Sequence, residues 1–281
     1  MTFADIAQRI ETLPSLSSIA EEIQDIYSGK TGDIDIVKLS KAIESDAMLT
    51  ANILKMINSP YYGFKTKISS ITLAITLLGA RKIIVLVIHY ALLNNVKADM
   101  SVYNLTNEQF NELCHLQSAL MLQWFSQIDV QEAGFLSSLA LIMEGGKLIL
   151  AHEVIESEYT SEFRQGFNEC ENSDEYEREL LGVTSYYISA KLFEHWNLDE
   201  LYIKILEGLN EQECSQDDKK ICEFIKALNI VRTAINVKEV LTEDSISKSV
   251  KLVEEMGYDH KYFEHTAYRL QAKYLNLNIE N

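Results

Sequence analysis

Turn-forming residues are so scarce in this chain that they restrict its fold class. The 281 residues include only 2 prolines and 11 glycines. An all-β sandwich joins many short strands by turns, and those turns depend on glycine and proline. Hydrophobic residues make up 47% of the chain and charged residues 24%, which is typical of a folded protein. The scarcity of turn residues therefore predicts an all-α protein.

The stretch Ser45–Gly79 shows how two of the expected helices are joined. Apolar residues recur at helical spacing in Asp46–Ile57. Pro60 lacks a backbone N–H and disfavours helical geometry at the residue before it, so the first helix ends there. Ser70 can cap a second helix, which Gly79 ends. We expect a rigid corner made of a helix, an aromatic turn and a second helix.

Periodic apolar residues predict helices along the rest of the chain. Asp33 or Asp35 can start a helix that turns Ile36, Leu39 and Ile43 inward. Together, the predicted helices cover approximately residues 3–11, 15–28, 35–44, 46–57, 70–79, 81–95, 106–127, 135–155 with a break at 145–146, 175–194, 199–210, 219–236, 243–256 and 259–275. The acid-rich stretch 153–179 is expected to form an exposed helix and a loop.

Three features favour a cytoplasmic location or argue against membrane insertion. The most apolar run, Ile83–Leu93, is too short to span a bilayer and contains a histidine, so we interpret it as a buried helix. The first ten residues lack the basic start and apolar core of a signal peptide. The 4 cysteines lie far apart with no C-x-x-C pair, which argues against a zinc site and fits reduced thiols.

The formal net charge of -17 is unevenly distributed. Residues 1–100 are balanced, so the acidic excess lies in residues 101–281. No Asp or Glu occurs between Ala47 and Ala98. Basic residues in that segment are Lys55, Lys65, Lys67, Arg81, Lys82 and Lys97. They either keep the surface of a core segment hydrated or form a docking face for an acidic partner. Nucleic acid is not an expected partner, because the acidic body would repel phosphates.

Several short motifs, in order, resemble a known family. They are Leu13-Pro14, Ser45-Asp46, Asn58-Ser59, Tyr62-Gly63, the run Ser70-Ile71 to Leu78-Gly79, Gly182-Val183 and Trp196-Asn197-Leu198. Between about residues 8 and 210, this pattern is similar to the HDOD domain. The resemblance implies an all-helical relative of HD-type metal-dependent phosphohydrolases, found in bacterial signalling proteins and usually thought to regulate or scaffold without catalysis.

The resemblance also implies a domain arrangement. We expect a two-lobed helical bundle, with the N-terminal lobe of the HDOD domain at about 1–100. An HD-like lobe without metal ligands follows at 101–210, and a C-terminal helical extension packs on the body at 211–281.

The metal ligands of an HD-type site are largely missing from the matching positions. The His-Asp pair of the family falls at Met143-Glu144, and a thioether is a poor ligand for hard metals. The histidine expected after Gly182-Val183 is replaced near Thr184-Ser185, and the later pair by Gly208-Leu209. His115 alone stands about where the family has its first histidine. We therefore expect no catalytic residues, no bound metal and no cofactor, and we expect that the protein is not an enzyme.

Two hypotheses about function follow. The first is a cytoplasmic signal-transduction protein that regulates other signalling proteins by binding them. Its contact face would be formed by Tyr61, Tyr62, Phe64, Lys65, Lys67, Arg81 and Lys82. The second is a sensor for a nucleotide or cyclic dinucleotide that uses the vestigial cleft. That cleft would be lined by His115, Met143, Glu144 and Lys147, although a lone His115 is more often a half-buried helix histidine satisfied by a hydrogen bond.

Overall fold

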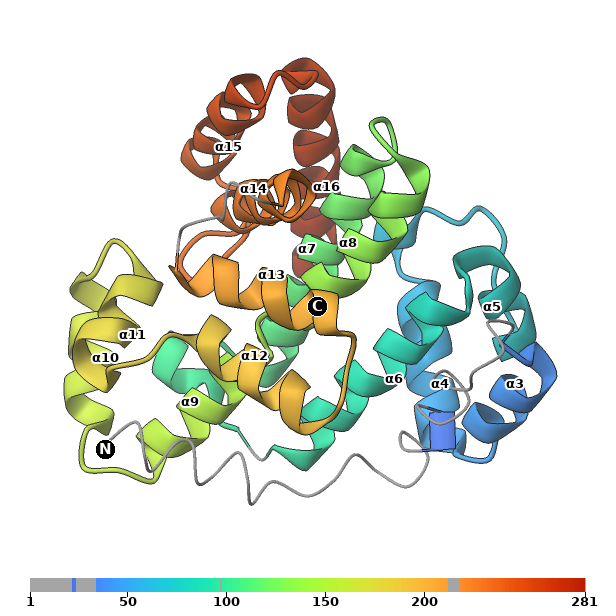
Figure 1. Cartoon of the computed structure of the whole chain (residues 1–281), viewed down its shortest axis with the longest axis horizontal. Helices are drawn as coiled ribbons and strands as arrows, with labels where there is room; N and C mark the ends of the chain where they lie inside the picture. The colour runs from blue at the N-terminus through green and yellow to red at the C-terminus, as the bar shows by residue number, and fades with distance from the viewer. Residues whose placement is uncertain (1–21, 24–33, 97, 212–217, 281) are drawn as a thin grey trace. The chain divides into compact units, whose positions relative to one another are not determined.

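The computed structural model is all-α and describes residues 22–23, 34–96, 98–211 and 218–280 (Figure 1). No β-strand occurs within these ranges, and an isolated antiparallel bridge joins Ile235 and Val240. The prediction of an all-α fold is confirmed. The helices predicted at 3–11 and 15–28 lie outside the described residues, apart from Glu22 and Ile23, which are helical.

The chain divides into two compact units. Of the described residues, 22–23 and 34–95 form one unit, and 96, 98–211 and 218–280 form the other. The division falls between Asn95 and Val96, and residues 218–280 belong to the same unit as residues 101–210. Each unit is described separately below.

Capping side chains and a glycine determine where several α-helices of the N-terminal unit begin or end. They are α3 (Ile36–Glu44), α4 (Ala47–Ile57), α5 (Ile71–Leu78) and α6 (Ala80–Asn95). The side chains of Asp35, Asp46 and Ser70 accept hydrogen bonds from the first-turn N–H groups of α3, α4 and α5. α5 ends at Gly79, whose φ of 83° suits a residue without a side chain.

The corner between α4 and α5 is locked by one side chain. The amide of Asn58 donates to the carbonyl oxygens of Leu54 and Ile68, and its oxygen accepts from the Ile68 N–H at 2.7 Å. Pro60 starts the short 3₁₀ turn η1 (Pro60–Tyr62), and Gly63 ends it with φ of 70°. In the predicted corner, the Asn58 side chain thus connects the end of α4 to the residues just before α5.

Three residues of this unit differ from their predicted exposure. Ile36, the first residue of α3, was expected to face inward but is 41% exposed. Tyr61 and Lys82 were expected on an exposed contact face, but they are only 4% and 5% exposed. Tyr61 lies inside the corner, and α6 is buried on nearly all sides from Lys82 to His89.

The C-terminal unit is built around α7 (Asn107–Phe125) and α8 (Val130–Ile142). Thr106 and Gln109 form a reciprocal capping box at the start of α7, as predicted for Thr106. α8 and α9 (Gly145–Ile155) together form the apolar stretch Val130–Ile155. This stretch has the length and hydropathy of a membrane span, but 94% of its most apolar window is buried inside the protein, as in a core helix.

The remaining helices surround this core. They are η2 (Met100–Tyr103), α10 (Thr160–Glu169), α11 (Ser173–Leu181), α12 (Ser185–His195), α13 (Glu200–Glu211), α14 (Lys219–Ala234), α15 (Glu243–Glu255) and α16 (His260–Glu280). The rings of Trp124 on α7 and Phe263 on α16 meet edge to face with centroids 5.1 Å apart. Cys114 and Cys170 are free thiols, whereas Cys222 is disulfide-bonded, so the expectation of reduced thiols is wrong for Cys222.

Candidate functional site

A glycine allows α9 and α12 to come close enough to form the site. A Cβ atom at position 146 would lie 1.9 Å from the carbonyl oxygen of Ser185, so no other residue fits there without separating the helices. The Gly146 N–H donates to Oγ of Ser189 at 2.8 Å. This close approach places Ser185 beside Lys147. The Lys147 ammonium donates a hydrogen bond to Oγ of Ser185 at 2.6 Å. The helix break predicted at Gly145-Gly146 lies at Met143-Glu144, between α8 and α9, and the two glycines form the start of α9.

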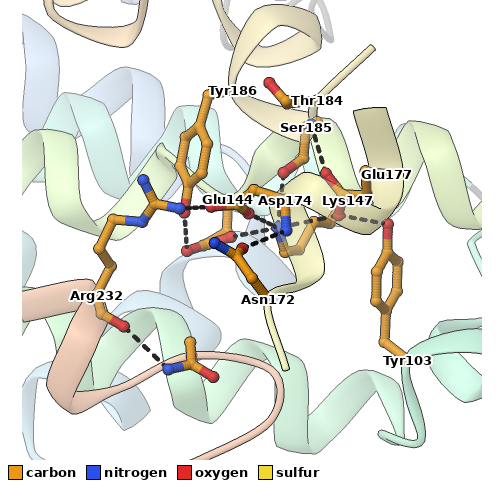
Figure 2. Close-up of polar contacts among 12 residues, drawn as sticks. Tyr103, Glu144, Lys147, Asn172, Asp174, Glu177, Thr184, Ser185, Tyr186 and Arg232 are labelled. Atoms are coloured by element: carbon orange, nitrogen blue, oxygen red, sulfur yellow. Dashed lines mark hydrogen bonds and ion pairs between the residues drawn. The ribbon is translucent and has the colours of Figure 1, made fainter. Parts of the chain in front are cut away.

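The ammonium of Lys147 lies at the centre of a buried ring of carboxylates (Figure 2). Its Nζ is 3.3 Å from Oε2 of Glu144, 3.5 Å from Oδ1 of Asp174 and 3.2 Å from Oε1 of Glu177. Only 2% of the Lys147 side chain is exposed. A buried ammonium is tolerated only with such compensation, because its transfer from water is otherwise very costly. We call Glu144, Asp174, Glu177 and Ser185 the lysine cage.

Two of the carboxylates come from the first turns of α11. Asn172 caps this helix by accepting from the N–H groups of Asp174 and Glu175. Asp174 and Glu177 are three residues apart, so they share one helix face and point at the same ammonium. Glu177 is fixed by two further donors. These are the phenol of Tyr103 at 3.0 Å and the backbone N–H of Ser185 at 2.7 Å.

Glu144 is held in the same manner from the other side of the cage. Its Oε1 accepts from the amide of Gln117 at 3.0 Å and from the phenol of Tyr186 at 2.8 Å. Burial alone would raise the pKa of Glu144, but the Lys147 ammonium, the Gln117 amide and the Arg232 guanidinium together lower it below its ordinary value. Glu144 is therefore an ionised carboxylate in the folded protein.

Arg232 on α14 supplies the second cation. It forms an ion pair with Asp174 and donates to Oδ1 of Asn229 at 3.1 Å. Its guanidinium lies 4.1 Å from the centre of the Tyr186 ring, in cation–π contact. Burial lowers the pKa of Arg232 to about 10, although the charge of Glu144 acts in the opposite direction. Arg232 thus remains charged at neutral pH.

The two tyrosines of the site act as hydrogen-bond donors. Burial, followed by the charge and hydrogen bond of Glu177, raises the pKa of Tyr103 well above its ordinary value. Burial, followed by the charge and hydrogen bond of Glu144, does the same to the pKa of Tyr186. Neither phenol is poised to give up its proton to a reacting group, so both serve to hold the carboxylates in place.

A cleft of about 450 Å³ opens beside the cage, and its walls include Glu144, Lys147, Asp174, Tyr186 and Arg232. Three asparagines in its walls are occupied by internal hydrogen bonds. Oδ1 of Asn172 caps α11, Oδ1 of Asn229 accepts from Arg232, and Oδ1 of Asn236 accepts from the N–H groups of residues 238 and 239. The cleft is therefore lined by polar side chains, but these three amide oxygens already accept hydrogen bonds from within the protein.

The family of the chain follows from comparison with known proteins. Residues 13–211, more than two thirds of the 281 residues, match the HDOD domain family. The chain belongs to the HDOD domain family. No protein with a curated description matches it.

Several solved structures resemble this HDOD chain over nearly its whole length. A virulence factor from Campylobacter jejuni subsp. jejuni is 25% identical, with 93% of this chain and 95% of that chain covered and a TM-score of 0.57. A candidate phosphohydrolase from Shewanella amazonensis SB2B is 17% identical over 96% and 95% of the two chains, with a TM-score of 0.68. A candidate signal transduction protein from Marinobacter aquaeolei VT8 is 18% identical over 97% and 59%, with a TM-score of 0.66. The last two likenesses show the fold alone.

In the part of this HDOD chain that the structure describes, the side chains near the expected metal site do not form the donor set of an HD-type centre. Glu144, where the resemblance places part of the His-Asp pair, and Ser185, near the expected place of a later histidine, both contact the Lys147 ammonium. A positive charge in that place repels a metal ion. Met143 is fully buried in the core. Throughout the described ranges, no group of three or more His, Cys, Asp or Glu side chains is placed to hold a metal ion.

Only some of the residues predicted for the two hypothetical sites lie where those sites require them. The structure brings Glu144 and Lys147 together at the cleft, whereas His115 and Met143 are buried and are absent from its walls. Of the predicted contact face, Phe64, Lys65, Lys67 and Arg81 are exposed, Tyr62 is partly buried, and Tyr61 and Lys82 are buried.

Sequence reasoning missed most of the cage. Asp174 and Glu177 lie in the acid-rich stretch that was expected to be exposed, yet Glu177 is completely buried. Arg232, on α14, lies 85 residues beyond Lys147. One available signal was the capping residue Asn172, followed by acids spaced three apart, which predicts a helix with paired carboxylates on one face.

Proposed function

We propose that this HDOD chain is a regulatory signalling protein that acts by binding other proteins and does not hydrolyse phosphate esters. The observation that supports this most is the position of Lys147. Its ammonium contacts Glu144 and Ser185, the side chains that stand in for metal ligands. HD-type hydrolysis needs a metal to orient and activate water, and a lysine ammonium cannot lower the pKa of water in that way.

The exposed part of the predicted contact face is the best candidate for partner binding. Phe64 is 37% exposed, and Lys65, Lys67 and Arg81 are exposed. The segment from Ala47 to Ala98 contains no Asp or Glu, so its own formal charge is positive. A partner with an acidic surface would be attracted over a distance, and this attraction would weaken with salt. The name of the Marinobacter relative, a candidate signal transduction protein, is consistent with this role.

The absence of catalysis is tested with generic and physiological phosphate esters. Purified protein is incubated with p-nitrophenyl phosphate, bis(p-nitrophenyl) phosphate and cyclic dinucleotides in the presence of Mn²⁺ or Mg²⁺. We expect turnover no faster than the metal-containing blank. Metal-dependent turnover that disappears in Glu144→Gln would contradict the proposal, because it would place a working site at the cage.

Partner binding is tested by capture from the native bacterial cell with a charge-reversal pair. Lys65→Glu with Lys67→Glu is expected to lose the captured protein at physiological salt. Lys226→Glu with Lys251→Glu is the matched control, because these lysines are also exposed but lie in the acidic C-terminal unit. Equal capture by both double variants would show that the chosen surface is wrong.

A second candidate function, a small-ligand sensor, is supported by the cleft volume of about 450 Å³, which is in the range of ligand sites. A nucleotide or cyclic dinucleotide bound there would raise the melting temperature, since a ligand at a hundredfold excess over its Kd adds about 2.7 kcal/mol to stability. A shift that Arg232→Gln abolishes would favour the sensor. No shift with any of these ligands would reject it.

A further inference from the structure

The last helix, α16, carries large apolar side chains on two faces. Its inner face packs on the C-terminal unit through Phe263, Ala267 and Leu270, which are completely buried. On the opposite face, Tyr268 is 40% exposed and Leu275 is 52% exposed. Because the inner face already holds α16 on its own unit, the outer side chains are available to another surface.

The outer face of α16 follows the spacing of a coiled coil. Its residues lie alternately four and three apart and are all exposed. They are Lys261, His265, Tyr268, Ala272 and Leu275, which we call the outer seam. This alternation is the a/d repeat, in which one seam of a helix faces a partner helix. Ile279 continues the spacing in the sequence. The outer seam is roughly 21 Å long at 1.5 Å per residue, which is enough for two heptads.

Two exposed residues of opposite charge flank the outer seam, one on each side. Glu264 takes a g position of the repeat and Arg269 takes the following e position. Arg269 donates to Oε1 of Gln123 at 2.7 Å. Within the part of the chain that the structure describes, neither Glu264 nor Arg269 forms an ion pair. Side chains at g and e positions are those that form ion pairs between the two helices of a coiled coil.

We infer that the outer seam is a dimer interface, on which α16 of a second copy of this chain lies in parallel. In a parallel pair with twofold symmetry, equivalent a and d residues meet, so Tyr268 and Leu275 contact their counterparts in the other copy. Glu264 of each copy then faces Arg269 of the other, which gives two ion pairs.

The charges favour the parallel pair over an antiparallel one. In an antiparallel pair, e positions of one helix meet e positions of the other. The e positions of α16 are Tyr262, Arg269 and Asn276, so none of them offers a carboxylate to Arg269. Only the parallel pair brings Arg269 opposite Glu264, and it does so on both sides of the seam.

The dimer should dissociate on dilution. Two heptads bury less area than a standard interface of about 1,600 Å², and Lys261 and His265 make one end of the seam polar. The inference goes beyond the proposed function. The outer seam belongs to the C-terminal unit and the predicted contact face to the N-terminal unit, so failure of one leaves the other standing.

The first test measures the mass of the full chain by sedimentation velocity at physiological salt over a series of micromolar concentrations. We expect wild type to form a dimer whose fraction falls on dilution. Tyr268→Glu should weaken the dimer at least about tenfold, because it places two like charges opposite each other. Val130→Glu is the matched control, since Val130 is 73% exposed on α8 and lies outside the seam. It should dimerise as wild type does.

Helical circular dichroism confirms that both variants are folded before their masses are compared. Wild type that is monomeric at every concentration would overturn the inference. So would a dimer that Tyr268→Glu and Val130→Glu affect equally.

The second test examines the parallel pairing. Glu264→Arg alone and Arg269→Glu alone should each weaken self-association, because each places like charges at both flanking pairs. A mixture of the two variants should form a heterodimer, since every flanking pair then joins an arginine to a glutamate. A mixture that associates no more strongly than either variant alone would overturn the parallel arrangement.

Discussion

The two compact units each contain a buried lysine, and burial has different consequences for the two lysines. Lys147 in the C-terminal unit is 2% exposed and lies within 3.5 Å of three carboxylates. Lys82 in the N-terminal unit is 5% exposed, in a segment with no Asp or Glu between residues 47 and 98. Burial lowers the pKa of Lys82 to about 7. The Lys147 ammonium is neutralised by the surrounding carboxylates, whereas desolvation makes the charged form of Lys82 less favourable.

This contrast separates two consequences of burying a charge. Carboxylates around an ammonium make it part of the structure, so removing either partner leaves an unpaired charge behind. Desolvation of an ammonium that lowers its pKa makes the charged form less favourable, so stability comes to depend on pH. The C-terminal unit should therefore respond strongly to substitution, and the N-terminal unit to pH.

The largest effect should come from Lys147→Met. Removing one partner of a buried ion pair typically costs about 3–5 kcal/mol, because the other charge is left buried and unpaired. We expect urea unfolding without divalent cations to show a loss of this size. Lys191→Met is the control, since Lys191 forms an ion pair on the surface with Glu194 and should cost less than about 1 kcal/mol. Equal losses in the two variants would remove the distinction between the cage and an ordinary surface pair.

The next effect is a rise in stability with pH that depends on Lys82. Its pKa is about 7 in the folded protein and near 10.5 in the unfolded chain. Between these values the unfolded chain binds one more proton, so the free energy of unfolding increases as pH rises, by at most about 1.4 kcal/mol per pH unit. The free energy of unfolding should stop increasing above the pKa of the unfolded chain, near 10.5. Below the folded pKa of about 7 none of this stabilisation should remain.

The measurement is chemical denaturation of wild type and Lys82→Met between about pH 7 and 10. Wild type should gain stability over this range relative to the variant, which lacks the titrating amine. A constant difference between the two proteins at every pH would mean that the Lys82 amine titrates normally. That result would remove the contrast between the two lysines.

A smaller effect should distinguish two glycines that serve different purposes. In Gly146→Ala the new Cβ would lie 1.9 Å from a backbone oxygen, so α9 and α12 must separate. Overpacking of this kind usually costs about 1–3 kcal/mol or more. In Gly63→Ala the space is free, and only the φ of 70° is unfavourable, at about 1–2 kcal/mol. Only Gly146→Ala should also disturb the cage, which near-ultraviolet circular dichroism of Tyr103 and Tyr186 would report.

The sequence predicts this fold well wherever the determining chemistry is local. The caps at Asp46, Ser70 and Thr106 act on the turn that follows them, so their neighbours in sequence suffice to place the helix starts. The same local reasoning fails at Ile36 and Lys82. Their exposure depends on which helix faces are covered by other helices, and the chain pattern alone does not contain that information.

The site is less predictable because its charges come from distant parts of the chain. Glu144 and Lys147 are three residues apart and could be proposed together. Asp174, Glu177 and Arg232 join them only when α11 and α14 pack against α9. A buried carboxylate and an exposed one look alike in sequence, so an acid-rich helix was expected to be exposed.

The central claim is that the Lys147 amine, and not a metal ion, supplies the positive charge of the cage. The most direct test is the urea midpoint of wild type and Lys147→Met, each measured in a chelator and in Mn²⁺. We predict the same midpoint for wild type in both conditions, and a lower midpoint for Lys147→Met because the carboxylates of the cage lose their ammonium. A wild-type midpoint that falls in the chelator, or a Lys147→Met midpoint equal to that of wild type, would contradict the claim.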